Sequence, residues 1–278
     1  MSTLFLVATP IGNLEDLSPR AQRILREVKL IAVEDTRHSR KLLDHFGIQT
    51  PMTSYFEHNE RLKLDEMLNA LQANSVALIS DAGMPGINDP GYLLVRAALD
   101  AGHQVSPIPG PSAPIAALAA SGLPSDQFLY LGYPPRKTSE RQREFEKIAE
   151  LPYTLIFLES PHRLLPTLED LREILGDRSV TVAAELTKMY ERFFRGNLSG
   201  ALSFFEKEPA RGEFTLVVAG AQQDAGRWRE DQVLSALREG VAANEKPSQL
   251  ARRVAATADW PRSEVYDLLQ KLNEPKRS

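Results

Sequence analysis

Residues 75–91 read SVALISDAGMPGINDPG, an apolar run followed at once by a turn rich in glycine and proline. The run at 75–79 has the length and composition of a strand that is buried on both faces. Residues 92–101 then continue as a helix. A strand, a turn and a helix in this order form one unit of an α/β sheet with parallel strands.

The same alternation extends on both sides of this stretch. Ser18 and Pro19 are typical of a helix start, because serine caps helices and proline suits their first position. Gly47 can close the following helix. We therefore predict a mostly parallel sheet, with strands at 3–8, 29–33, 75–79 and 104–108 and with helices from residue 18 and at 36–46, 60–72, 92–101 and 112–120.

The alternation resumes after residues 121–126, which form a candidate boundary. We expect strands at 128–131, 154–158, 180–185 and 214–219, and helices at 140–150, 161–175 and 198–206. Three helical segments without a strand follow, at 230–239, 247–256 and 263–272. The sequence thus predicts an α/β protein with an N-terminal α/β domain at 1–122, a C-terminal α/β domain at 123–223 and a small helical module at 224–278.

The composition excludes several kinds of site. The 278 residues include no cysteine, so disulfides, thiolate chemistry and cysteine-bound metals are excluded. Five histidines form no paired metal-binding pattern, and we expect no metal. The apolar run at the N-terminus is too short for a signal peptide or a membrane span. We expect a cytoplasmic protein with no membrane partner.

Three loops rich in glycine, proline and short polar residues, at 9–13, 80–86 and 109–113, each follow a predicted strand. Ligands of doubly wound sheets bind beyond the carboxyl ends of strands, so we expect these loops to share a cleft. None contains the GxxxxGK[ST] or GxGxxG pattern that holds nucleotide phosphates. A ligand held by backbone groups and apolar surface, such as an adenosyl or methionyl group, fits better.

Seven blocks, in order over roughly residues 3–220, closely resemble those of the tetrapyrrole-methylase-like superfamily, and within it the branch that methylates ribosomal RNA. Met84 and Asn88 depart from the more usual Thr and Ser. Neither change affects contacts made through the backbone. The blocks are LFLVATPIGNLEDLSPRA, AVEDTRHSRKLL, ALISDAGMPGINDPG, PIPGPSAPIAALAASGLP, FLYLGYPPRK, LESPHRL and AELTKMYERFFRG.

This resemblance implies two α/β domains, a methyl donor bound in the cleft between them, and a homodimer. The donor would be S-adenosylmethionine. The reaction would be 2′-O-methylation of a cytidine ribose in the decoding region of 16S rRNA, with free 16S rRNA or the small ribosomal subunit as partner. Carried over residue by residue, the donor pocket would comprise Pro10, Gly12, Asp81, Ala82, Gly83, Ser112 and Ala113, with Leu158 and Thr215 at positions that match less closely.

A ribose hydroxyl is a weak nucleophile, so a base must take its proton as it attacks the sulfonium methyl group. The candidate bases are Lys188 (if its pKa is lowered), Glu159 and Asp35, and the sequence does not choose among them. Arg37 and Arg163 would hold the flanking phosphates. Each has a structural alternative, such as a helix cap for Asp35 and a salt bridge between Lys188 and Glu185. The reaction itself requires no metal.

Residues 225–278 carry ten basic and eight acidic residues, whereas the remainder carries 23 basic and 29 acidic residues. We therefore predict that the helical module positions RNA through Arg252, Arg253, Arg262 and Lys271. The alternative is that it only packs on the second domain or on a dimer partner. Trp228 and Trp260 are expected as core anchors.

Two other functions remain open from the sequence. One is C-methylation of a tetrapyrrole on the same fold, which has no use for a basic helical tail. The other is a non-catalytic, RNA-binding ribosome-assembly factor that retains an inactive donor site.

Overall fold

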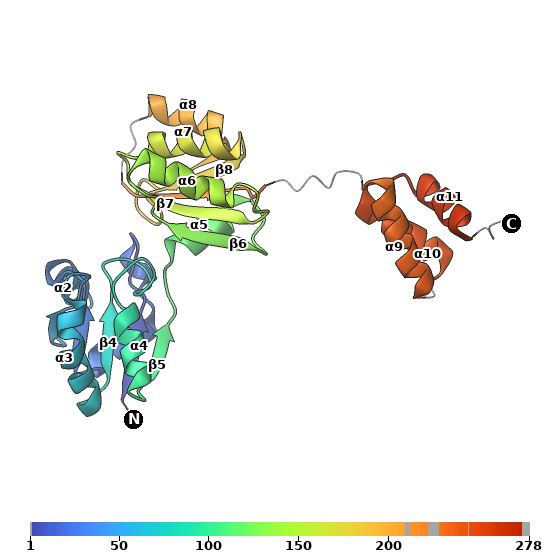
Figure 1. Cartoon of the computed structure of the whole chain (residues 1–278). Coiled ribbons are helices and arrows are strands. Elements are labelled where there is room, and N and C mark those ends of the chain that lie inside the picture. The colour runs from blue at the N-terminus through green and yellow to red at the C-terminus, as the bar shows by residue number, and fades with distance from the viewer. Residues whose placement is uncertain (1, 209–211, 222–227, 244, 274–278) are drawn as a thin grey trace. The chain divides into compact units, whose positions relative to one another are not determined.

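The computed structural model of the protein describes residues 2–208, 212–221, 228–243 and 245–273. The chain forms two compact units, residues 1–220 and residues 221–278 (Figure 1). In the described ranges, no helix combines the length and the apolar character needed to cross a lipid bilayer.

The first sheet has five parallel strands in the order β3-β2-β4-β1-β5, as the buried apolar runs predicted. Its short edge strand β3 was not predicted, because three half-buried residues with two hydroxyl side chains give no apolar pattern. The strands are β1 (Thr3–Val7), β2 (Leu30–Val33), β3 (Met52–Ser54), β4 (Val76–Ile79) and β5 (Gln104–Ile108).

Helices pack on both faces of the first sheet. Ile24 and Leu43 lie in one core with Ile31, whereas Met67 and Leu94 lie in the other core, on the opposite face. The predicted start of the first helix is confirmed, since the Ser18 hydroxyl accepts a hydrogen bond from the Ala21 N–H at 3.1 Å. The helices are η1 (Leu14–Asp16), α1 (Pro19–Glu27), α2 (Thr36–His45), α3 (Glu60–Ala73) and α4 (Tyr92–Asp100).

The second sheet is mostly antiparallel, unlike the first. In its order β6-β7-β10-β8-β9, only β6 and β7 are parallel. Strand β10 inserts antiparallel between β7 and β8, and residues 185–191 connect β8 directly to the unpredicted edge strand β9. The strands are β6 (Phe128–Gly132), β7 (Thr154–Glu159), β8 (Ser179–Ala184), β9 (Arg192–Asn197) and β10 (Phe214–Val218).

Helices α6 (Thr138–Ile148), α7 (Leu164–Leu175) and α8 (Leu198–Lys207) cover one face of this sheet around a large apolar core. Helix α5 (Ala113–Ser121) covers the other face, where Leu118 packs with Ile156 and Val217. The chain therefore reaches the second sheet before α5 begins, although α5 directly follows the last strand of the first sheet (Figure 1). The boundary at residue 122 stays a prediction, because residues 1–220 form one unit.

In the described residues of the second unit the chain forms three helices, α9 (Glu230–Ala242), α10 (Pro247–Ala258) and α11 (Arg262–Asn273). They share an apolar core, against which Trp228 and Trp260 pack. The indole N–H of Trp260 donates to the carbonyl oxygen of Trp228 at 2.5 Å. The expected role of the tryptophans as core anchors is confirmed.

Candidate active site

The three glycine- and proline-rich loops meet at one edge of the first sheet, as expected. Thr9 and Gly83 exchange two backbone hydrogen bonds of 2.9 and 3.0 Å, which fasten the first loop to the second. The Thr9 hydroxyl also donates to the Ser80 carbonyl. In the third loop, a Cβ at Gly110 would lie only 2.9 Å from the Cβ of Ala8. The absence of a side chain at Gly110 therefore allows close packing.

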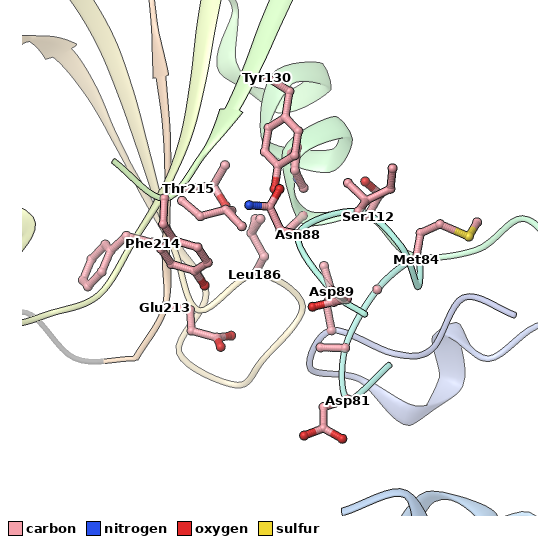
Figure 2. Close-up of a pocket in the computed structure, with 18 of the residues that line it drawn as sticks. Asp81, Met84, Asn88, Asp89, Ser112, Tyr130, Leu186, Glu213, Phe214 and Thr215 are labelled. Carbon is pink, nitrogen blue, oxygen red and sulfur yellow. The ribbon is translucent and has the colours of Figure 1, made fainter. Parts of the chain in front are cut away.

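These loops form one wall of a cavity of about 270 Å³ within the first unit. Strand ends and loops of the second sheet form the opposite wall. Figure 2 shows Tyr130, Glu213 and Thr215 on one side, and Asp81, Met84 and Ser112 on the other. The remaining lining residues are Ile11, Glu34, Ala82, Gly83, Ile87, Asn88, Asp89, Ala113, Pro114, Tyr133, Leu158, Leu186, Lys188 and Phe214.

Most of the residues predicted to hold the donor line this cavity: Asp81, Ala82, Gly83, Ser112, Ala113, Leu158 and Thr215. Pro10 and Gly12 do not. Gly12 instead packs against the loop after β8, where a Cβ would lie 2.5 Å from Lys188 Cγ and 2.7 Å from the Leu186 carbonyl oxygen. Because Gly12 has no side chain, the first loop can pack directly against residues 186–188, which follow strand β8 of the second sheet.

Three carboxyl groups, from Glu34, Asp81 and Asp89, give the cavity an acidic wall. The Asp81 side chain accepts the Asp35 N–H at 3.3 Å, and the Glu34 side chain accepts the Asp81 N–H at 3.4 Å. Burial raises the pKa of Glu34. Burial also raises the pKa of Asp89 to about 6, with a further contribution from the negative charges of Glu34 and Asp81. A hydrogen bond from Ser80 acts in the opposite direction and lowers the pKa.

Sequence reasoning missed Glu34 and Asp89 as site residues. The available signal for Glu34 was its position directly after a predicted strand. Asp89 stands before Pro90 and Gly91 and looked like ordinary turn chemistry.

Lys188 lines the cavity on a loop with two left-handed residues, Glu185 (φ 54°) and Thr187 (φ 64°). Its Nζ lies 3.0 Å from Glu185 Oε1 and 3.6 Å from Glu213 Oε2. Burial lowers the pKa of Lys188, but the hydrogen bond to Glu185 and the charges of both glutamates outweigh burial and raise it overall. The lowered pKa that a catalytic base would need is therefore not found here.

Asp35 and Arg37 lie outside the cavity lining. Asp35 caps helix α2, accepting the Arg37 N–H at 2.7 Å, and pairs with the Arg37 guanidinium at 3.2 Å. The side-chain hydrogen bond from Arg37 holds the pKa of Asp35 below its usual value. A carboxylate stabilised in this way is a weak base. The Arg37 side chain is 90% exposed in spite of this pair.

Glu159 and Arg163 also lie outside the lining and form a structural pair. Glu159 is fully buried, accepts hydrogen bonds from Thr167 Oγ1 and the Ser160 N–H, both at 2.7 Å, and meets Arg163 at 3.3 Å. Arg163 also donates to the carbonyl oxygen of Pro134 at 2.5 Å. Both side chains are thus committed to internal partners.

A family model described as Tetrapyrrole (Corrin/Porphyrin) Methylases matches residues 3–202. The chain belongs to this family. The match covers the first sheet, strands β6 to β9 of the second sheet and most of the residues that line the cavity.

Among the chain's relatives, the ribosomal RNA small subunit methyltransferase I of Synechocystis sp. is 47% identical over 275 residues, which are 98% of this chain and 99% of that protein. The protein of the same name from Xylella fastidiosa is 46% identical over 269 residues, 95% of this chain and 97% of its own length. The similarity therefore extends beyond the family's two sheets into the second unit.

Solved structures of two methyltransferases and of diphthine synthase share the fold. The methyltransferase CobJ superposes with a TM-score of 0.58 at 20% identity, over 80% of this chain and 95% of its own. A uroporphyrin-III C-methyltransferase from Thermus thermophilus, in complex with S-adenosyl homocysteine, gives 0.54 at 20% identity, over 78% and 97%. Diphthine synthase gives 0.60 at 14% identity, over 96% and 100%.

Proposed function

We propose that this protein transfers a methyl group from S-adenosylmethionine to the 2′-oxygen of a cytidine ribose in the decoding region of 16S rRNA. The observation that carries the proposal is the likeness, over nearly the whole chain, to relatives named ribosomal RNA small subunit methyltransferase I. With this function we propose the small ribosomal subunit or its RNA as partner, a cytoplasmic location and a homodimer.

The chemistry of the cavity supports S-adenosylmethionine as the ligand. This donor carries a positive sulfonium and a positive ammonium group, which the acidic wall of Glu34, Asp81 and Asp89 would attract. Leu158, Leu186 and other apolar side chains of the lining suit the adenine ring. When bound, the sulfonium supplies the methyl group and leaves as a neutral thioether.

Two charged groups of the cavity have properties that the reaction needs. A general base works best when its pKa lies near the working pH, and Asp89, with a pKa of about 6, meets that condition, whereas the pKa of Asp35 is lowered and that of Lys188 is raised. Lys188 keeps its proton and would stabilise negative charge that develops on the attacking oxygen. We assign proton removal to Asp89 and charge stabilisation to Lys188.

The second unit supports a role in RNA positioning. Arg252, Arg262 and Lys271 have exposed side chains, whereas Arg253 pairs with Glu245 at 2.7 Å and is partly neutralised. Helices α10 and α11 are joined by only three residues, with Asp259 in the left-handed conformation (φ 50°). Helix pairs with such short turns occur in nucleic-acid-binding modules.

Incubation of purified protein with radiolabelled S-adenosylmethionine and either free 16S rRNA or small subunits tests the proposal. We expect label in 2′-O-methylcytidine, and a backbone that resists alkaline cleavage beside the target. Label on a base alone contradicts the ribose assignment, and transfer to a porphyrinoid but not to RNA favours tetrapyrrole methylation. A non-catalytic assembly factor would bind RNA without binding the donor in calorimetry.

The same assay tests the expectation that no metal participates. Activity should survive EDTA when the RNA is kept folded by a polyamine. Loss of turnover that a divalent cation restores, at unchanged RNA folding, would contradict this expectation.

A further inference from the structure

Residues 133–137, which read YPPRK and follow strand β6, form a loop that two arginines hold from beneath. Arg163 donates to the carbonyl oxygens of Pro134 and Pro135 at 2.5 and 3.2 Å. Arg141 donates to the carbonyl oxygens of Pro135 and Arg136, both at 3.5 Å. Three successive carbonyl groups of this 133–137 loop are therefore fixed by side chains from helices α6 and α7 and their caps.

Each arginine is itself held by a buried carboxylate. Arg141 is 3% exposed and donates through Nε to Asp170 Oδ2 at 2.6 Å, and Arg163 pairs with the fully buried Glu159. Buried ion pairs contribute little net stability compared with apolar packing. Two such pairs beneath one surface loop, together with two prolines that restrict its backbone, therefore serve rigidity more than stability.

The 133–137 loop places an aromatic ring at the cavity and carries a cation three residues further along the chain. Tyr133 lines the cavity and is 49% exposed. Burial, and then the charges of Glu213, Asp89 and Glu159, raise the pKa of its phenol, so the ring stays neutral. Arg136 is exposed and makes no ion pair within the described part of the chain, whereas its neighbour Lys137 pairs with Glu140 at 3.0 Å.

An exposed aromatic ring and an exposed guanidinium on one short loop match single-stranded nucleic acid, whose bases stack on rings while cations bind the phosphates. We propose that the 133–137 loop recognises the methylated nucleotide: Tyr133 stacks on its base and Arg136 binds its adjoining phosphate. This rests on the proposed function, since it takes RNA as the substrate. A base stacked on the cavity wall brings the ribose of the same nucleotide to the donor.

The test measures binding of a fluorescent single-stranded RNA with the decoding-region sequence, alongside calorimetric affinity for S-adenosylmethionine. Tyr133→Ala should weaken RNA binding about 5- to 150-fold, the range for losing one stacked base, and Tyr133→Phe less than about 2-fold. Tyr133→Leu, which keeps apolar bulk but no aromatic face, should behave like alanine. Because Tyr133 also lines the donor cavity, donor affinity can fall in these variants, but much less than RNA affinity.

Arg136→Ala should weaken RNA binding and reduce the slope of log affinity against log salt by about 0.7, the value for one phosphate contact on a single strand. Tyr133→Ala should leave this slope unchanged. Tyr153→Ala and Arg143→Ala are the matched controls, because both residues are exposed in the same unit and neither lines the cavity. Neither control should alter RNA affinity.

Unchanged RNA affinity in Tyr133→Ala overturns the assignment. An equal loss of donor affinity and RNA affinity also overturns it, because Tyr133 would then act as part of the donor-binding wall. If wild-type protein binds the RNA but does not methylate it, the proposed function fails. The assignment of the 133–137 loop is then still tested by the RNA affinities of the Tyr133 and Arg136 variants. If wild-type protein does not bind RNA, both fail.

Discussion

Asp89 faces the cavity together with Glu34, Asp81, Tyr130 and Tyr133, and burial is the main reason that its pKa rises from 3.8 to about 6. A carboxyl group whose pKa is raised by folding favours the folded state when protonated, and this contribution is present below pH 3.8 and lost as the pH rises through 6. Asp89→Asn, which cannot ionise, should therefore unfold at a temperature a few degrees higher than wild type at pH 8.

That gain should shrink between pH 6 and pH 4 and vanish at pH 4. Thermal unfolding without donor, followed over this range, measures it. Asp100→Asn, on an exposed residue of helix α4, is the control for removing a carboxylate from the surface. A difference in Tm that is the same at every pH would mean that Asp89 ionises as freely in the folded protein as in the unfolded chain.

Gly83 offers a second test at the residue scale, because it lines the cavity with a φ of 82°. A Cβ there has room, with Ile11 Cγ2 at 3.7 Å as its nearest neighbour, but the left-handed backbone costs about 1–2 kcal/mol for an L-residue. Gly83→Leu should lose this much stability and should also lose donor binding, since the longer side chain occupies the cavity wall.

Gly47→Leu is the matched control for this variant. Gly47 has a φ of 62° and open space around it, and it does not line the cavity. It should lose similar stability in urea denaturation and keep full donor affinity in calorimetry. Equal donor affinity in both variants would locate the donor away from Gly83.

The sequence predicted the three loops because glycine and proline at strand ends act locally. The relations among charged residues were not predictable in this way. Arg163 contacts Pro134, 29 positions away, and Lys188 contacts Glu213, 25 positions away. Burial and pairing over such separations decide whether a charged residue binds substrate or holds the fold, and no local pattern encodes them.

At the scale of elements, the pair Glu159–Arg163 joins the turn after β7 to the 133–137 loop after β6. Arg163→Met should destabilise the protein by about 3 kcal/mol, because it leaves a buried carboxylate without its cation. Adding Glu159→Gln should restore part of this loss, since the amide carries no charge. Urea denaturation of the two single variants and the double variant measures the coupling.

Normal stability of Arg163→Met with weaker RNA binding would support the phosphate contact expected from the sequence. It would also remove the support for the 133–137 loop. This variant therefore separates the two roles of one arginine.

Strands that are buried on both faces were predicted from the sequence. Strands that form only because a neighbouring strand pairs with them were not. The four apolar runs of the first sheet were predicted, because parallel strands covered by helices must be apolar throughout. Strand β9 reads RFFRGN, with two arginines and a glycine, and becomes a strand only because β8 pairs with it. The position of β10 between β7 and β8 depends on pairing between segments that are far apart in the chain, so no local sequence pattern predicts it.

For the whole molecule, the division into two compact units allows removal of residues 221–278. We expect the remaining unit to keep its donor affinity and oligomeric state, to bind RNA more weakly, and to show a shallower salt dependence, because phosphate contacts are lost. Replacing Arg252, Arg262 and Lys271 with glutamine in the full chain should reproduce the shallower slope. Unfolding or dissociation after truncation, or an unchanged slope, would favour the alternative that the second unit only packs.

Helix α5 leaves the ribosome directly after the first sheet is complete, yet its apolar face packs on strands β7, β8 and β10. Strand β10 ends at Val218, 97 residues after Ser121, the last residue of the helix. At 5–20 residues per second, the newly made helix waits roughly 5–20 s before its last partner strand exists. During synthesis, this interval leaves the apolar face of the helix exposed, which favours aggregation of the nascent chain and its binding by chaperones.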